Sequence, residues 1–185
     1  MIPYQKEKIE NAICFFASEH TKKTRQPLYQ TFLYKYLAFL DFEILKATGR
    51  PCLGLSYMAM EHGPVPMEIY GKLHTVKSSC FEYREEQENK ITIRPKGKPN
   101  LDYFSQPEIK QMQRLIEIYA QSYIPAKWIS DASHQDIIAW KKTWNKCHNS
   151  MIDYSTEFDD DLFKKKEEEL TYPEESYLTY RALEI

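Results

Sequence analysis

The stretch of residues 28–45 is apolar on nearly every side of a helix, and this feature constrains the fold more than any other in the chain. A helix that is apolar all round belongs in a protein interior. Gly49 provides its C-terminal stop, because a residue without a Cβ adopts the left-handed conformation at little cost. The following Arg50-Pro51 keeps the helix from resuming. The rest of the chain is therefore expected to pack around this buried helix.

A second constraint lies in the sequence His62-Gly63-Pro64-Val65-Pro66. Two prolines separated by one residue, next to a glycine, predict a stiff and extended turn. Pro66 can also serve as the first residue of a helix over residues 67–72. Such rigidity predicts a surface that is held in one shape.

The remaining segments predict a mainly α-helical α+β fold with a small antiparallel sheet or hairpin. A weak alternation predicts a short strand at residues 55–61. Two alternating runs, around residues 81–83 and 91–93, predict a hairpin. Residues 20–26 and 95–107 read as surface connectors. Apolar periodicity predicts further helices at residues 3–19, 105–122 and 133–144, the second opened by a Ser105/Glu108 capping box and the third capped by Ser130 or Ser133.

Length and charge indicate one domain with an appendage. The chain has 185 residues, of which 42 % are hydrophobic and 28 % charged, which is a globular composition. Residues 153–185 hold 11 acidic and 4 basic side chains. We therefore expect a globular domain at residues 1–152 and an acidic, tyrosine-containing extension at residues 153–185. This extension is either a helix over residues 157–170 or disordered until a partner binds.

No signal peptide or membrane span is expected, so the cytosol is the predicted location. In that reducing compartment, free thiols are expected at Cys14, Cys52, Cys80 and Cys147. Cys147-His148, with Cys80 and His74, suggests zinc, but the Cys-x-x-Cys and His-x-x-x-His pairs of zinc sites are absent from the sequence. We expect neither a metal nor a cofactor.

Several motifs occur in a fixed order and at characteristic separations. They are Leu33-Tyr34-Lys35-Tyr36-Leu37 leading to Asp41-Phe42, then Thr48-Gly49-Arg50-Pro51, then Met60-Glu61-His62-Gly63-Pro64-Val65-Pro66 closing on Ile69-Tyr70. A later region contains Ile129-Ser130, Ser133-His134 and Trp140. Together the set resembles the Panacea-domain family of SocA-like antitoxins over most of residues 28–144, a family found near phage and mobile-element proteins.

The resemblance implies a binding function without enzyme activity. Members of that family look like bacterial antitoxins that bind a neighbouring toxin directly. One type looks like an adaptor that delivers its toxin to a cytosolic protease. The expected partners are therefore a cognate toxin or phage-encoded protein and, for an adaptor, a cytosolic protease.

Asp41 lies among apolar neighbours, where an unpaired charge would be costly. The functional interpretation makes it an acid or base, with His62 and His134 completing a general-base set. The structural interpretation has it accept hydrogen bonds from backbone N–H groups, around residues 63–65. Since no nucleophile in a strained turn accompanies the set, the structural interpretation is favoured for Asp41, and a capping or core role for His134.

The expected contact surface is centred on the double-proline corner. Aromatic and methionine side chains usually carry most of the energy of a protein interface. A gap-filling role in the core is the alternative use of the methionines. The predicted partner-binding residues are Tyr57, Met58, Gly63, Pro64, Val65, Pro66, Met67, Tyr70 and Trp140.

A winged-helix DNA-binding regulator of a mobile element or prophage is the alternative function. The predicted order of helix, strand, helix and hairpin is reminiscent of winged-helix domains. Acidic residues among the basic ones argue against it, because they would face phosphates with the wrong sign. The basic residues are Lys72, Lys77, Arg84, Lys90, Arg94, Lys96 and Lys98, and the acidic ones Glu82, Glu85, Glu86 and Glu88.

Overall fold

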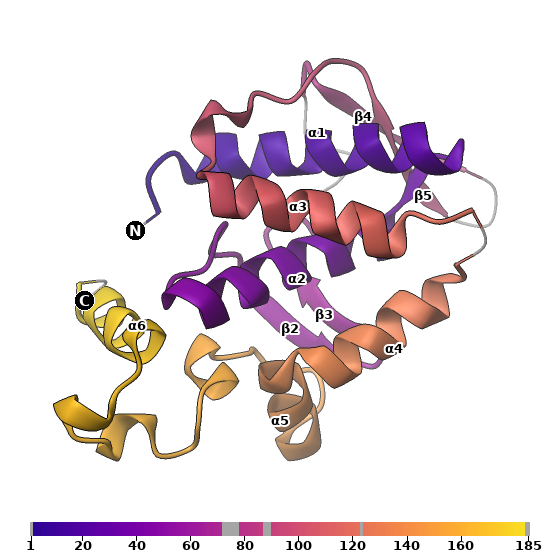
Figure 1. The fold of residues 1–185 in the computed structure, drawn as a ribbon. Helices are drawn as coiled ribbons and strands as arrows, with labels where there is room; N and C mark the ends of the chain where they lie inside the picture. Colours follow the sequence, from indigo (N-terminus) through magenta and orange to yellow (C-terminus); the bar gives the residue numbers. More distant parts are fainter. Residues whose placement is uncertain (1, 72–77, 87–89, 123, 184–185) are drawn as a thin grey trace.

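The computed structural model describes residues 2–71, 78–86, 90–122 and 124–183, and Figure 1 shows their arrangement. The helices are α1 (Gln5–Thr24), α2 (Gln30–Thr48), α3 (Gln106–Tyr119), α4 (Ala126–Asp136), α5 (Ile138–Lys146) and α6 (Tyr172–Ala182). The strands are β1 (Leu28–Tyr29), β2 (Tyr57–Met60), β3 (Gly63–Pro66), β4 (Phe81–Glu85) and β5 (Ile91–Pro95). The predicted mainly α-helical α+β fold with small antiparallel sheets is confirmed.

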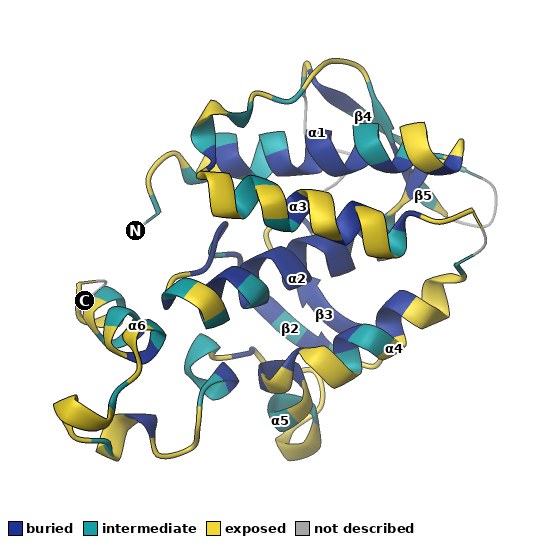
Figure 2. Ribbon diagram, in the orientation of Figure 1, coloured by how far each residue is buried: buried dark blue, intermediate teal, exposed yellow. Residues whose placement is uncertain are grey.

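The buried helix predicted from the sequence is α2, around which the other elements pack. It is buried from Phe32 to Leu45 except at Glu43, and most of this part is dark in Figure 2, whereas its last turn is teal and yellow. It ends at Gly49, which has a left-handed backbone with φ 77°, as predicted. Within the described residues, no helix combines the length and apolar character needed to cross a bilayer.

Helix α1 runs further than the sequence pattern predicts. The residues expected to form a basic connector continue the helix as far as Thr24, and Arg25 ends it in a left-handed conformation. Two polar side chains of this last part are buried: Thr24, and His20, whose Nδ1 lies 3.0 Å from the Tyr36 hydroxyl. Packing against α2 therefore extends the helix through a polar segment that the local sequence predicts to be a connector.

Two small antiparallel sheets flank α2. One contains β1, β5 and β4 in that order, so that the predicted hairpin forms with Tyr83 opposite Ile93. The other is the β2–β3 hairpin, with Tyr57 opposite Pro66 and Met60 opposite Gly63. The double-proline corner is thus a short, buried strand and not a free turn.

The helix predicted at residues 67–72 is wrong. Residues 67–71 form turns, in which Pro66 O accepts the N–H groups of Ile69 and Tyr70 at 3.3 and 2.9 Å. Met67 N also donates to Ser56 O at 2.8 Å, which ties the turn to the segment before β2. Lys72 lies outside the described residues.

The predicted capping box is confirmed at the start of α3, where Glu108 accepts from Ser105 N at 2.7 Å.

The single helix predicted at residues 133–144 is wrong, because α4 begins at Ala126 and α5 follows a break at Ile137. Ile137 has an extended backbone. Ser133 lies inside α4 and donates to Ser130 O at 2.7 Å, so neither serine is a cap. Instead, Glu157 accepts from Ala139 N at the start of α5, at 2.8 Å.

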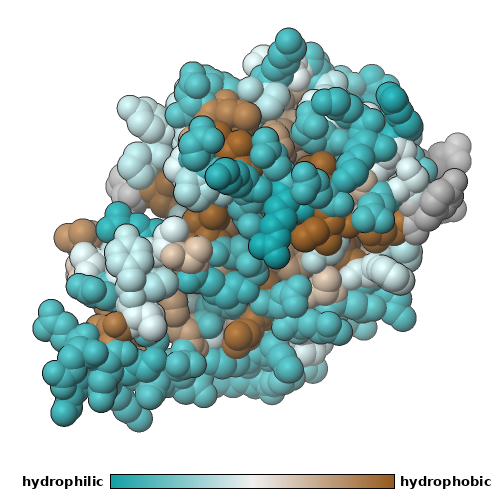
Figure 3. All heavy atoms as spheres, viewed as in Figure 1, coloured by the Kyte–Doolittle hydropathy of each residue, from teal (hydrophilic) through white to brown (hydrophobic). Residues whose placement is uncertain are grey.

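The acidic extension is neither a helix over residues 157–170 nor disordered. Short 3-10 turns at Tyr154–Glu157, Leu162–Lys164 and Glu167–Glu169 lead into α6, and the surface over these turns is almost uniformly hydrophilic in Figure 3. Lys165 joins Asp159 and the buried Glu174, at 3.0 and 2.6 Å. Helix α6 packs on the end of α2 through its buried Tyr177. The domain boundary at residue 152 stays a prediction.

The prediction of four free thiols is wrong for one pair, since Cys14 and Cys80 form a disulfide. Their Cα atoms lie 5.7 Å apart although 66 positions separate them in the chain. The fold therefore creates a proximity that the spacing of the cysteines does not reveal. Cys52 and Cys147 are free, as predicted.

Candidate functional site

Asp41, on α2, is a fully buried carboxylate that fixes the loop before β2. Its Oδ1 accepts the N–H groups of Leu53 and Gly54, the latter at 3.1 Å. Its Oδ2 accepts Leu55 N–H at 3.2 Å and the Tyr57 hydroxyl at 2.9 Å. Oδ2 also accepts the Tyr154 hydroxyl at 3.2 Å, and the same hydroxyl lies 2.7 Å from Leu55 O. The donors therefore come from residues 53–57 and from Tyr154, and not from residues 63–65.

The surroundings of Asp41 suit a structural carboxylate. Burial raises its pKa above the ordinary value, while the backbone N–H bonds and the Tyr57 hydroxyl act in the opposite direction. Both oxygens are already engaged, and the side chain has no exposed surface. The general-base set considered as the alternative is not assembled, because Asp41 bonds to this loop whereas His134 stacks on Trp140 at 4.0 Å.

Lys35 is a buried lysine that sequence reasoning missed. It lies on α2, is 2 % exposed, and donates from Nζ to Pro64 O in β3 at 3.2 Å. Burial lowers its pKa to about 7. Among the described residues, no carboxylate forms an ion pair with it. The only sequence signal was its position inside an apolar helical run, where a lysine must be covered by another element.

Gly63 lets the β2–β3 hairpin lie directly on this lysine. Its φ is +101°, which an L side chain rarely adopts. A Cβ at this position would lie 2.5 Å from Ser133 Oγ and 2.8 Å from Lys35 Nζ. The glycine of the predicted corner is therefore required by close packing between β3, α2 and α4.

Four stacked rings, which we call the aromatic ladder, run from this buried region to the surface. They are His134, Trp140, Trp144 and His148, with successive centroid distances of 4.0, 5.7 and 3.8 Å. Trp140 is buried, and its Nε1 donates to Met60 O at 3.0 Å. Trp144 is half-buried and His148 exposed. The pKa of His134 is lowered mainly by burial and to a smaller extent by the charge of the nearby Lys35.

The predicted partner-binding residues divide by accessibility. The buried ones are Tyr57, Gly63, Pro64, Val65, Pro66 and Trp140, of which the first five form the inner side of the hairpin and Trp140 packs against it from α5. Met58 and Met67 are half-buried, and Tyr70 is 45 % exposed while its ring lies 6.5 Å from that of Tyr34. Sequence reasoning missed the exposed end of the aromatic ladder, although the spacing of Trp140, Trp144 and His148 by four residues was a visible signal.

The β4–β5 hairpin has few features of a DNA-binding wing. Two of its predicted phosphate contacts are engaged in ion pairs, Arg84 with Glu82 at 2.6 Å and Arg94 with Glu86 at 3.0 Å. Lys72 and Lys77 lie outside the described residues, as does His74 of the considered zinc set. Among the residues that are described, no group of three or more His, Cys, Asp or Glu side chains is arranged to hold a metal.

Comparison with known proteins places this arrangement in a family. No curated protein and no solved structure shows significant similarity to the chain. The family model described as antitoxin SocA-like, Panacea domain, matches residues 33–141, which is more than half of the chain. The match includes Lys35, Asp41, the β2–β3 hairpin and Trp140. The chain therefore belongs to the SocA-like antitoxin family and carries its Panacea domain.

Proposed function

We propose that this protein neutralises a cognate toxin, or a phage-encoded protein, by binding it directly. The observation that carries the proposal is the family match over residues 33–141, because that family is described as antitoxin-like. Binding accounts for the matched residues without a chemical step. Asp41 already accepts five donors, and Lys35 is covered by β3, so both suit a scaffold that holds a surface in place.

The contact surface in this proposal is the accessible side of the β2–β3 hairpin and the end of α5. We call it the hairpin surface, and it consists of Met58 in β2, Met67 and Tyr70 in the turn after β3, and Trp144 and His148 at the end of α5. It combines methionine with aromatic side chains, which are enriched where binding energy concentrates. The hydrogen bond from Trp140 to Met60 O and the close packing at Gly63 support a preformed hairpin, which lowers the entropy lost on binding.

Co-expression with the product of the adjacent gene tests the proposal. We expect that product to arrest growth when it is expressed alone. This chain should restore growth and co-purify with it. If growth is not restored and no complex forms, neutralisation by direct binding is wrong for that gene pair. A DNA mobility shift with a steep salt dependence, in the absence of such a complex, would favour the winged-helix regulator instead.

The same cells distinguish sequestration from delivery to a protease. The level of the toxin should stay constant when this chain only sequesters it. The toxin level should fall, and recover when the cytosolic protease is inactivated, if the chain acts as a proteolytic adaptor. A western blot of the toxin after translation is stopped measures both outcomes.

A further inference from the structure

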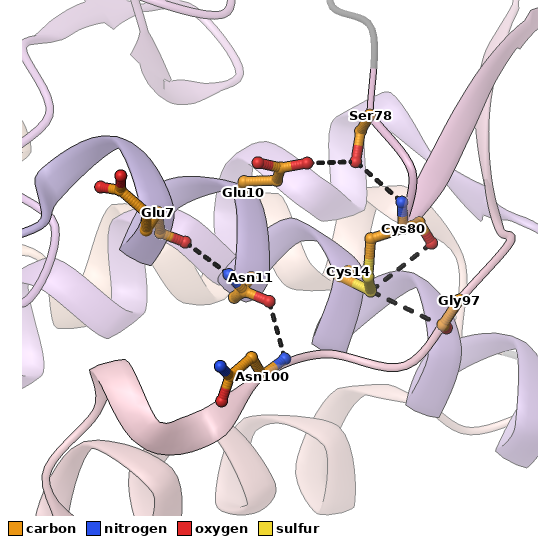
Figure 4. Close-up of a disulfide and its surroundings, with 8 residues drawn as sticks. All are labelled: Glu7, Glu10, Asn11, Cys14, Ser78, Cys80, Gly97 and Asn100. Atoms are coloured by element: carbon orange, nitrogen blue, oxygen red, sulfur yellow. Dashed lines mark hydrogen bonds between the residues drawn. A yellow bond between two sulfur atoms is a disulfide. The ribbon is translucent and has the colours of Figure 1, made fainter.

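The Cys14–Cys80 disulfide fastens helix α1 to the start of strand β4, as Figure 4 shows. Cys14 lies on α1 and is fully buried, whereas Cys80 precedes β4 and is 7 % exposed. A second link runs beside it, since Ser78 Oγ donates to Glu10 Oε1 at 2.6 Å and accepts Cys80 N–H at 3.0 Å. The hydrogen bond from Ser78 to Glu10 can break and re-form, whereas the disulfide is a covalent link between the two segments. The redox state of the cysteines therefore decides whether a covalent link joins α1 to the start of β4.

The carbonyl of Cys80 extends this connection to the end of β5. It accepts Lys96 N–H at 2.8 Å and Gly97 N–H at 3.0 Å. The linker that follows is also held on α1, because Asn11 Oδ1 accepts Asn100 N–H at 2.7 Å. The disulfide thus lies at a junction of α1, β4 and the segment after β5.

An apolar cleft of about 320 Å³ lies between the two elements that the disulfide joins. Ile9 and Ile13 of α1 form one wall, and Phe81 and Tyr83 of β4 form the opposite one. Ile69, in the turn after β3, completes the apolar lining. The two cysteines directly adjoin this lining in the sequence, since Cys14 follows Ile13 and Cys80 precedes Phe81. The disulfide therefore limits how far the two walls of the cleft can separate.

We propose that the Cys14–Cys80 disulfide is a reversible redox tether that holds α1 and β4 together and thereby sets the width of the apolar cleft between them. In the reducing step, a thiolate of a dithiol reductant attacks one cysteine sulfur and the S–S bond breaks. The other cysteine leaves as a thiolate and takes up a proton. The second thiol of the reductant then resolves the mixed disulfide, so that the protein gains two electrons and two protons and the reductant becomes a disulfide.

This tether is independent of toxin binding, and its test needs only the purified full chain. The oxidised protein is compared with protein reduced by dithiothreitol, using amide hydrogen exchange resolved on α1 and β4 and the fluorescence of anilinonaphthalene sulfonate as an apolar probe. We expect reduction to speed exchange in β4 by about tenfold or more and to change the fluorescence of the bound probe. Exchange in α4 and α5 should change little.

Cysteine variants separate the tether from other effects of the reductant. Cys147→Ser removes an exposed free thiol and should keep the full response. Cys14→Ser should show the reduced pattern with or without dithiothreitol. If Cys14→Ser does not fold, thiol counting by mass spectrometry on the wild-type chain establishes its redox state, and amide exchange in β4 is then compared between the counted oxidised and reduced forms. Equal exchange and equal probe fluorescence in the two redox states, or four free thiols under oxidising conditions, would overturn the proposal.

Discussion

Replacing Asp41 with asparagine should destabilise the fold strongly, because at least two donors face each oxygen of this carboxylate. Leu53 and Gly54 N–H donate to Oδ1, and Leu55 N–H and the Tyr57 hydroxyl donate to Oδ2. At the Oδ1 position, the NH₂ group of an asparagine would face two backbone N–H donors. At the Oδ2 position, it would break the bonds from the Leu55 N–H and from the Tyr57 hydroxyl. Two lost hydrogen bonds to a charged group, at about 1.5 kcal/mol or more each, give a loss of about 3 kcal/mol in the free energy of unfolding.

Urea denaturation of Asp41→Asn and wild type measures this loss as a lower midpoint at an unchanged slope. Glu43→Gln is the matched control on the same helix. Glu43 is half-buried and forms a salt bridge with Lys46, so this change should shift the free energy of unfolding by about 0.5 kcal/mol or less. A loss below about 1 kcal/mol in Asp41→Asn would refute the structural role of this carboxylate.

Three further perturbations test other parts of the fold. Burial lowers the pKa of Lys35 to about 7 from 10.5, so the unfolded chain binds the proton that the folded chain lacks. Urea titrations at several pH values should therefore show wild type gaining stability relative to Lys35→Met as the pH rises from 7 to 10. Gly63→Ala combines a φ of +101° with a contact at 2.5 Å, and thermal unfolding should show a loss of about 1–3 kcal/mol. Reducing the Cys14–Cys80 disulfide, which spans 66 positions, should lower the free energy of unfolding by up to about 4 kcal/mol, and denaturation of Cys14→Ser should show no further loss with reductant.

Features with a local cause were predictable from the sequence. The all-round apolar pattern of residues 28–45 led to α2, and Gly49 marked its end. The Ser105/Glu108 capping box marked the start of α3, because its hydrogen bonds join residues only three apart. The hairpin of β4 and β5 also followed from alternation and a polar turn.

Features that depend on contacts distant in the sequence were missed or misplaced. The break at Ile137 depends on Glu157, which receives the first N–H groups of α5 from 18 residues downstream. The partner loop of Asp41 was expected at residues 63–65 and lies at residues 53–57, since nothing in the local pattern favours one loop over the other. The burial of Lys35 likewise follows only when β3 covers α2.

The extension shows the same limit. Its blocks of like charge favoured either a helix at residues 157–170 or disorder. In the fold, Lys165 bonds to the buried Glu174, which also closes the capping box of α6 with Thr171. This arrangement depends on α6 packing against the end of α2. The contact is close at Gly49, because a Cβ at this position would lie 2.1 Å from Pro173 O.

The most direct test of the central claim is the affinity of the purified chain for the product of the adjacent gene, measured by calorimetry. The account predicts a complex that Tyr70→Ala and Trp144→Ala each weaken by about tenfold or more. Trp128→Ala and Tyr172→Ala should leave the affinity unchanged, because these side chains are 65 % and 72 % exposed and lie outside the hairpin surface. Absence of a complex, or equal affinity in all four variants, would contradict it.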